Sequence, residues 1–150
     1  MIHPANERHL DEILDIEKMV FTHPWSREKL KSDLILNYNT ENWVFLKDEQ
    51  VVGYLFGWKV MDEFHINNIA VHTAFQHKHI GQSLIRHLKT RLIRHDIQRI
   101  YFEVNGGNKT AQLLYESLGF KQRGICKDYY AIGYHALLYH LDLIGNGRVV

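Results

Sequence analysis

The chain has 150 residues, enough for one domain with a sizeable core, and its 45% hydrophobic and 23% charged residues are typical of a globular protein. Its formal net charge of +1 excludes the strong positive field of a general nucleic-acid-binding protein, so we expect no direct nucleic-acid partner. The single cysteine, Cys126, excludes an internal disulfide and a cysteine-rich zinc site.

The chain also lacks the marks of a secreted or membrane protein. Its start, "MIHPANERHLDE", has no basic segment followed by an apolar run, so no signal peptide is predicted. The longest apolar run, "VVGYLFGWKV", is too short and too interrupted to span a bilayer. No repeat or low-complexity tract divides the sequence. We therefore expect a single domain over residues 1–150, located in the cytoplasm and without a membrane partner.

Helical and strand-like patterns follow one another along the first half. A largely apolar stripe predicts a first helix, and Ser26 is a candidate N-cap for a second. "NWVFLKDEQVVGYLFGWKV" indicates two strands joined by a turn at residues 48–50, and "EFHINNIAV" indicates a third strand. The stripe of the first helix consists of Leu10, Ile13, Leu14, Glu17, Met19 and Val20.

The second half continues this alternation. From Ile80 the apolar spacing predicts a helix of about four turns, and "QRIYFEV" predicts a strand. "NKTAQLLYESLGF" predicts a short helix closed by Gly119. Strands near "FKQRGICK" and "HALLYHLDL" complete the domain. This order predicts an α/β fold with a mixed sheet, in which the strand-helix-strand steps are parallel crossovers.

The stretch "AVHTAFQHKHIGQSL", from Ala70 to Leu84, passes from a strand end through a loop into a helix start. Backbone N–H groups there lack helical partners and the helix dipole adds partial positive charge, which suits phosphate oxygens. Gly81 is expected to let the chain turn tightly and a ligand approach the backbone. Basic residues dominate from Gln76 to Arg99, with Lys78, Arg86, Lys89, Arg91, Arg94 and Arg99 against one acid, Asp96.

Three histidines in this stretch, His72, His77 and His79, raise the question of a metal site. No cysteine, aspartate or glutamate lies in the loop beside them, so a third ligand would have to come from elsewhere. Solvated loop histidines are the simpler interpretation, and we expect no metal.

A second stretch, "FEVNGGNKTAQLLYESLGF", places a carboxylate, an amide and a phenol in one strand-helix step. Glu103 ends a strand inside an apolar sequence, where a charge is costly unless it is used or paired. Asn108 opens the next helix and Tyr115 lies two turns further on, so the two share a face. The three groups can therefore converge on one site. Each has a structural alternative, namely an ion-paired edge residue, an N-cap and a core residue.

These two stretches resemble the acetyl-CoA-binding core of the GNAT superfamily of N-acetyltransferases. The pattern "N-x-x-A-x-x-L-Y-E-x-L-G-F" from Asn108 to Phe120 is specific to that superfamily. "HPWS" at residues 23–26 and "DYY" at residues 128–130 resemble its RimI-type ribosomal-protein-alanine N-acetyltransferases. The resemblance covers nearly the whole chain. It implies the GNAT fold, in which two parallel strands, here "INNIAV" and "IYFEV", splay apart and seat the pantetheine arm.

The resemblance implies acetyl-CoA as cosubstrate and assigns roles by position. It makes Glu103 the base and Tyr115 the acid, and it lets the backbone N–H of Val71 polarise the thioester carbonyl. The residues implied to bind acetyl-CoA are Ile69, Ala70, Val71, Gln76, His77, Lys78, His79, Ile80, Gly81, Gln82 and Asn108.

The acceptor implied by the resemblance is a protein N-terminus, such as that of a ribosomal protein. Trp25, Tyr129 and Tyr130 are implied to line a narrow slot for this extended chain. A GNAT enzyme that acetylates a small-molecule amine or a protein lysine is an open alternative. A non-catalytic acetyl-CoA-binding module is another.

The chain departs from the family pattern at three places. His79 stands where the phosphate loop usually has its first glycine, and Asn105 stands where RimI-type sequences usually have arginine. Tyr134, His135 and Ala136 replace the usual Glu-Asp-Ala. The last two departures concern the acceptor rather than the chemistry.

Overall fold

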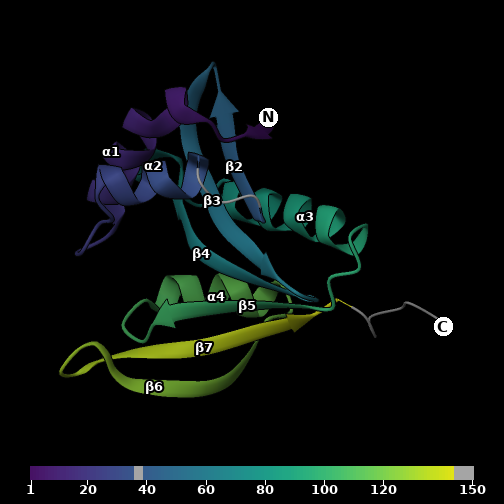
Figure 1. The fold of residues 1–150 in the computed structure, drawn as a ribbon. Coiled ribbons are helices and arrows are strands. Elements are labelled where there is room, and N and C mark those ends of the chain that lie inside the picture. Colours follow the sequence, from purple (N-terminus) through teal and green to yellow (C-terminus); the bar gives the residue numbers. More distant parts are fainter. Residues whose placement is uncertain (36–38, 144–150) are drawn as a thin grey trace.

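The computed structural model describes residues 1–35 and 39–143. Within these ranges seven strands form one sheet, flanked by four α-helices (Figure 1). In chain order the elements are β1 (Ile2–Pro4), η1 (Glu7–His9), α1 (Leu10–Val20), α2 (Arg27–Ile35), β2 (Thr40–Lys47), β3 (Gln50–Val60), β4 (Glu63–Val71), η2 (Thr73–Phe75), α3 (Ile80–Ile93), β5 (Arg99–Asn105), α4 (Lys109–Ser117), β6 (Lys121–Ala131) and β7 (Tyr134–Asp142).

The sheet is mixed, and its strand order is β1-β2-β3-β4-β5-β7-β6. Among the described strands only the β4–β5 pair is parallel, and the other neighbours are antiparallel. The predicted α/β fold and the parallel β4–α3–β5 crossover are thus confirmed. The second predicted crossover differs, because β7 inserts between β5 and β6. β6 still runs parallel to β5 but is not its neighbour.

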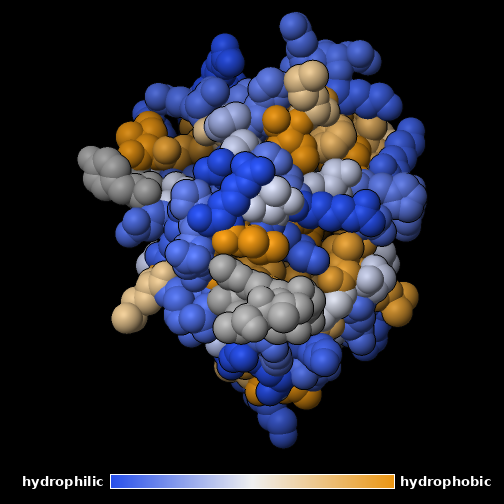
Figure 2. Space-filling view, turned by 90° about the vertical axis from the view of Figure 1, so that its right-hand side faces the viewer, coloured by the Kyte–Doolittle hydropathy of each residue, from blue (hydrophilic) through white to orange (hydrophobic). Residues whose placement is uncertain are grey.

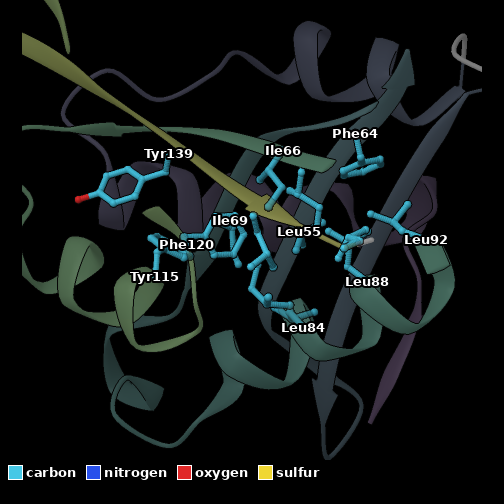
Figure 3. Packing of buried hydrophobic residues seen from close by; sticks show 14 of the residues in the cluster. Leu55, Phe64, Ile66, Ile69, Leu84, Leu88, Leu92, Tyr115, Phe120 and Tyr139 are labelled. Atoms are coloured by element: carbon cyan, nitrogen blue, oxygen red, sulfur yellow. The ribbon is translucent and has the colours of Figure 1, made fainter. Parts of the chain in front are cut away.

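Helices cover both faces of the sheet, and each face has its own core. Helices α1 and α2 pack on one face over a cluster that includes Leu10, Leu30 and Tyr54. Helices α3 and α4 pack on the other face (Figure 1). Figure 3 shows this second cluster, where buried side chains of α3 meet those of β3 and β4. The two clusters explain the apolar stripes of the helices, since each stripe faces the sheet.

The parallel pair β4–β5 separates halfway along its length. Its register runs from Glu63 opposite Arg99 to Ile66 opposite Phe102 and then ends. Asn67 has no partner in the register with β3 either, because Phe56 pairs with Asn68 and Gly57 pairs with Ile66. This one-residue bulge bends β4 away from β5. Figure 1 shows the two strands starting side by side and diverging toward their C-terminal ends.

Gly57 makes room for this bulge. A Cβ at position 57 would lie 2.4 Å from the Phe64 ring and 2.6 Å from the backbone oxygen of His65. Because neither distance is possible for a real side chain, only glycine lets β3 approach β4 at the point where β4 bends.

Local sequence signals set most element boundaries correctly. β4 and α3 have the bounds predicted from "EFHINNIAV" and from the apolar spacing after Ile80. The Ser26 hydroxyl accepts a hydrogen bond from the backbone N–H of Lys29 at 3.2 Å, and Gly119 ends α4 with φ of +96°. β1 was not predicted, because three residues carry no period and the strand forms only by pairing Ile2 with Phe45.

A bilayer-spanning helix is not found in the described part of the chain, where the longest helix, α3, has 14 residues. The face seen in Figure 2 is mostly hydrophilic, and its exposed hydrophobic residues form separate small groups.

Candidate active site

The diverging ends of β4 and β5 define the centre of the candidate site. The backbone N–H of His72 donates to Val52 of β3 at 2.8 Å. Since successive backbone N–H groups of a strand point to opposite sides, the N–H of Val71 points away from β3. Val71 has no register partner in β5 on that side. A backbone donor is therefore presented where a carbonyl oxygen of a bound ligand can accept it.

The start of α3 offers more backbone donors. The first backbone hydrogen bond at the start of α3 runs from the N–H of Ser83 to the carbonyl of His79. The side chain of His79 makes no capping hydrogen bond. The N–H groups of Ile80, Gly81 and Gln82 precede this bond and so have no partner within the helix. With the positive end of the helix dipole, they form a site suited to phosphate oxygens.

Two histidines form the turn before α3. His77 and His79 have φ of +63° and +62°, in the left-handed region that glycine adopts most easily. His79 thus has a backbone conformation that glycine adopts most easily.

The predicted turn role of Gly81 is wrong. Gly81 is buried inside α3, and a Cβ there would lie 3.3 Å from Leu114 of α4. Its lack of a side chain lets the start of α3 pack closely against α4, and the turn is made by His77 and His79 instead.

The three histidines do not act as one group. The Nδ1 atom of His72 accepts from the backbone N–H of Ala74 at 3.0 Å, while His79 Nδ1 lies 3.2 Å from Gln82 Oε1. His77 is exposed. Among residues 1–35 and 39–143, no three histidine, cysteine, aspartate or glutamate side chains are placed to hold a metal ion.

The basic residues after Gln76 do not all serve the loop. Arg91 pairs with Glu41 of β2 at 2.5 Å, and Arg99 pairs with Asp142 of β7 at 2.5 Å. Burial by itself raises the pKa of Glu41, but hydrogen bonds from Arg91 and Trp43 outweigh it and hold that pKa below its usual value. Arg91 therefore ties α3 to the sheet. Lys78 is the basic residue of the loop itself.

Glu103 is exposed, so the apolar sequence around it does not bury its charge. The side chain of Tyr129 in β6 hydrogen-bonds to it, and this bond raises the pKa of Tyr129. The pair places a carboxylate and a phenol at the solvent side of β5, next to the diverging strands. A carboxylate there can take a proton through water without a desolvation cost.

Tyr115 is buried, with 4% of its surface exposed, and its ring lies 4.5 Å from that of Phe102 (centroid to centroid). It belongs to the same cluster as Ile69 of β4, as Figure 3 shows. Burial raises the pKa of Tyr115, so its hydroxyl stays protonated at neutral pH. The phenol therefore carries a proton that it can donate, and its burial makes it a weaker acid than a solvated tyrosine.

Asn108 has the capping role that its position suggests. Its side-chain oxygen accepts from the backbone N–H of Ala111 at 3.1 Å, and the residue is exposed. One function of Asn108 is thus to start α4, which carries Tyr115.

Cys126 lies half-buried on β6.

The turn between α1 and α2 carries Trp25, whose side chain is half-buried. The Lys29 ammonium lies 5.1 Å from the centre of the Trp25 ring. The backbone N–H of Trp25 donates to the Glu17 carboxylate at 2.9 Å. Tyr129, which is predicted to line the acceptor slot with Trp25, is half-exposed. The side chain of Tyr130, the third predicted residue of that slot, lies outside what the structure describes.

Glu17 is a buried carboxylate that the sequence analysis placed only in the helical stripe. It is 1% exposed and contacts β3, β4 and the turn with Trp25. The available signal was a charged residue on the apolar face of an amphipathic helix, where an unpaired carboxylate is costly.

Taken together, these groups can hold a phosphate-bearing thioester and an amine in one place. Backbone donors lie at the start of α3 and at Val71. The protonated phenol of Tyr115 is buried in the core, and the carboxylate of Glu103 is exposed to solvent. This set suits direct acyl transfer to an amine, which needs an oxyanion donor, an acid and a base.

Comparisons with known proteins agree with this chemistry. The model of the acetyltransferase (GNAT) family matches residues 10–120. A Bacillus subtilis (strain 168) protein named as a candidate ribosomal protein bS18-alanine N-acetyltransferase is 33% identical over 121 residues, 81% of this chain and 80% of that protein. The ribosomal protein bS18-alanine N-acetyltransferase of Escherichia coli (strain K12) is 30% identical over 115 residues, 77% of this chain and 76% of that protein.

Solved structures agree with the fold. The crystal structure of the ribosomal-protein-S18-alanine N-acetyltransferase from Escherichia coli superposes with a TM-score of 0.89 at 25% identity, covering 100% of this chain and 97% of that one. Ard1 from Thermoplasma volcanium has the same fold, with a TM-score of 0.86 at 19% identity over 95% of this chain and 96% of that one.

Proposed function

This chain belongs to the acetyltransferase (GNAT) family, and from that premise we propose that it moves acetyl from acetyl-CoA directly to the N-terminal α-amine of a protein. The proposed acceptor is the N-terminal alanine of a ribosomal protein. The observation that carries the proposal is the similarity to bS18-alanine N-acetyltransferases over more than three quarters of the chain. We also propose that residues 1–150 form a single domain. Because the proposed acceptor is ribosomal, the proposed location is the cytoplasm.

The proposed acetyl-CoA site follows the diverging strands and the start of α3. The pyrophosphate is bound by the loop of residues 76–82, through the backbone N–H groups before Ser83 and through Lys78. The pantetheine arm lies along residues 69–71 of β4, with Asn108 on its other side. The left-handed conformation of His79 supports this assignment, because it preserves the turn despite the missing glycine.

In the proposed reaction the amine nitrogen attacks the thioester carbon, the N–C bond forms and the C–S bond breaks. Glu103 accepts the proton of the amine through a water molecule. The N–H of Val71 meets the charge that develops on the carbonyl oxygen. Tyr115 gives its proton to the leaving sulfur, and its place in the same cluster as Ile69 of β4 supports this role.

An α-amine is the easier acceptor for one carboxylate working through water. Its pKa of about 7.7–8.0 leaves roughly a tenth of it neutral at pH 7, whereas a lysine amine with a pKa of about 10.4 is neutral in about one molecule per few thousand. The difference amounts to roughly 3.5 kcal/mol, at about 1.36 kcal/mol per pKa unit. The exposed position of Glu103 gives an entering N-terminus access to it.

A competition assay tests the acceptor. The protein is incubated with acetyl-CoA and a peptide that begins with the N-terminal alanine sequence of a bacterial ribosomal protein bS18 and contains an internal lysine. Free thiol is followed, and the acetylated position is mapped by fragmentation mass spectrometry. The matched controls are the same peptide with a blocked N-terminus and the polyamine spermidine.

Acetyl on the alanine α-amine, with no reaction of the blocked peptide, is the expected result. Acetyl on the lysine, or on spermidine alone, would contradict the proposed acceptor. Acetyl-CoA binding without transfer to any of the three would instead indicate a binding module.

A further inference from the structure

Glu17 of α1 joins three parts of the molecule through its buried carboxylate. One oxygen accepts from the Tyr54 hydroxyl of β3 and from the Asn68 side-chain amide of β4. The other accepts from the backbone N–H of Trp25 at 2.9 Å. All three partners donate, and an ionised carboxylate is an acceptor on both oxygens, so the set is matched.

The network joins two separate segments of the chain, β4 at Asn68 and the turn that carries Trp25. Asn68 directly follows the bulge residue Asn67, where β4 leaves β5, and it lies three residues before Val71. Trp25 lies in the turn between α1 and α2. The same side chain therefore holds the β4 segment that faces the thioester and the turn that faces the acceptor.

Stability alone does not favour a carboxylate at this position. The neighbouring buried stripe residues Ile13 and Ile16 are apolar, and burying a charge costs free energy that an apolar side chain avoids. What an apolar residue cannot do is accept the backbone N–H of Trp25 and the amide of Asn68 together.

We propose that Glu17 is a positioning residue for acetyl transfer, which fixes the turn bearing Trp25 relative to β4 and so sets the width of the acceptor site. This inference rests on the proposed function, since it assumes that Trp25 lines the acceptor site. It assigns no proton transfer to Glu17, which is 1% exposed.

Glu17→Gln is the test variant, because it keeps the shape but replaces one acceptor oxygen by an NH2 group. With its oxygen toward Tyr54 and Asn68, the new NH2 faces the N–H of Trp25, donor against donor. Glu12→Gln is the matched control. Glu12 lies on the same helix and likewise accepts a backbone N–H, that of Val51 at 2.8 Å, away from the acceptor site.

Steady-state kinetics with the alanine peptide and amide hydrogen exchange of Trp25 are measured for wild type and both variants. We expect Glu17→Gln to raise the KM for the peptide about ten- to hundredfold, as for loss of one hydrogen bond to a charged group, and to change the KM for acetyl-CoA less than about twofold. We also expect the backbone amide of Trp25 to lose protection against hydrogen exchange in Glu17→Gln. Glu12→Gln changes neither KM nor the exchange of Trp25.

Equal peptide KM values in the two variants, with the wild type active, would overturn the positioning role. If the wild type does not acetylate the peptide, the proposed function fails, and unchanged Trp25 exchange in Glu17→Gln then overturns the positioning role separately. If Glu17→Gln does not fold, Tyr54→Phe replaces it, since it removes one donor to Glu17. A peptide KM for Tyr54→Phe above that of Glu12→Gln supports the inference, and an equal value overturns it.

Discussion

Glu103 of β5 and Tyr115 of α4 lie on opposite sides of strand β5. Glu103 is exposed on the face of the sheet against which α1 and α2 pack. The ring of Tyr115 packs against Phe102, the residue before Glu103, on the face of the sheet against which α3 and α4 pack. Successive side chains of a strand point to opposite faces, so one strand separates the proposed base from the proposed acid. The amine can thus lose its proton on one side while the sulfur gains one on the other.

Replacing the buried phenol tests the acid. Tyr115→Phe is expected to lower kcat by about 10²–10⁴-fold, the usual range for a positioned acid, while the KM for acetyl-CoA changes little. Steady-state kinetics at saturating peptide measure this. The matched control is Tyr139→Phe, another buried tyrosine of the same cluster, whose hydroxyl faces Glu116 at 3.5 Å. Similar rates for the two variants would assign Tyr115 to packing.

Replacing the exposed carboxylate tests the base. Glu103→Gln is expected to lower kcat by at least about 10²-fold, the lower end for a positioned base, because the amide cannot accept the proton of the amine. Glu63→Gln changes a half-exposed carboxylate at the start of β4, where β4 still pairs with β5, and is expected to retain the wild-type rate. Loss of activity in both variants would point to surface charge rather than to a base at Glu103.

The strained turn before α3 predicts a stabilising substitution. His79→Gly relieves a left-handed conformation worth about 1–2 kcal/mol and loses about 0.5–1 kcal/mol through the greater freedom of glycine in the unfolded chain. The free energy of unfolding in urea should therefore rise, by up to about 1.5 kcal/mol. His79→Ala removes the imidazole but keeps the Cβ, so it should give no such gain. A gain in the alanine variant equal to that in the glycine variant would locate the effect in the side chain.

The bulge of β4 depends on Gly57. Gly57→Ala is expected to lower the free energy of unfolding by about 1–3 kcal/mol or more, because its Cβ would overlap the Phe64 ring and the His65 carbonyl. Gly124→Ala is the control, since the nearest atom to a Cβ there is 3.6 Å away and contact is ordinary. Chemical denaturation of both variants measures the difference, and equal stabilities would show that β3 and β4 adjust without cost.

Acid is expected to destabilise the protein partly through His9. Burial lowers the pKa of His9, and its Nδ1 accepts from the backbone N–H of Asn6 at 3.1 Å, which requires the neutral ring. Below its ordinary pKa of about 6.5 the unfolded chain binds the proton more readily than the folded one, so stability falls as pH falls through this value.

Urea unfolding at pH 8 and pH 5.5 measures this loss. His9→Gln keeps an acceptor but does not titrate, so its stability should change less between the two pH values. An equal change in wild type and variant would place the acid sensitivity elsewhere.

Much of the framework followed from the sequence, because it depends on interactions within a few residues. The apolar period gave the bounds of α3, the alternation gave β4, and a C′ glycine gave the end of α4 at Gly119. The position of Asn108 at the start of α4 was equally local, since an N-cap bonds three residues ahead.

The tertiary structure alone decided how the site is built, since its partners lie far apart in the chain. Glu17 is buried because Tyr54 and Asn68, 37 and 51 residues away, donate to it, and a helical stripe does not name such partners. The exposure of Glu103 depends on the face that β5 presents within the sheet. The turn before α3 is left-handed at His79, a conformation that histidine does not require, and Gly81 lies close to Leu114 of α4, a contact between elements that a local pattern does not name.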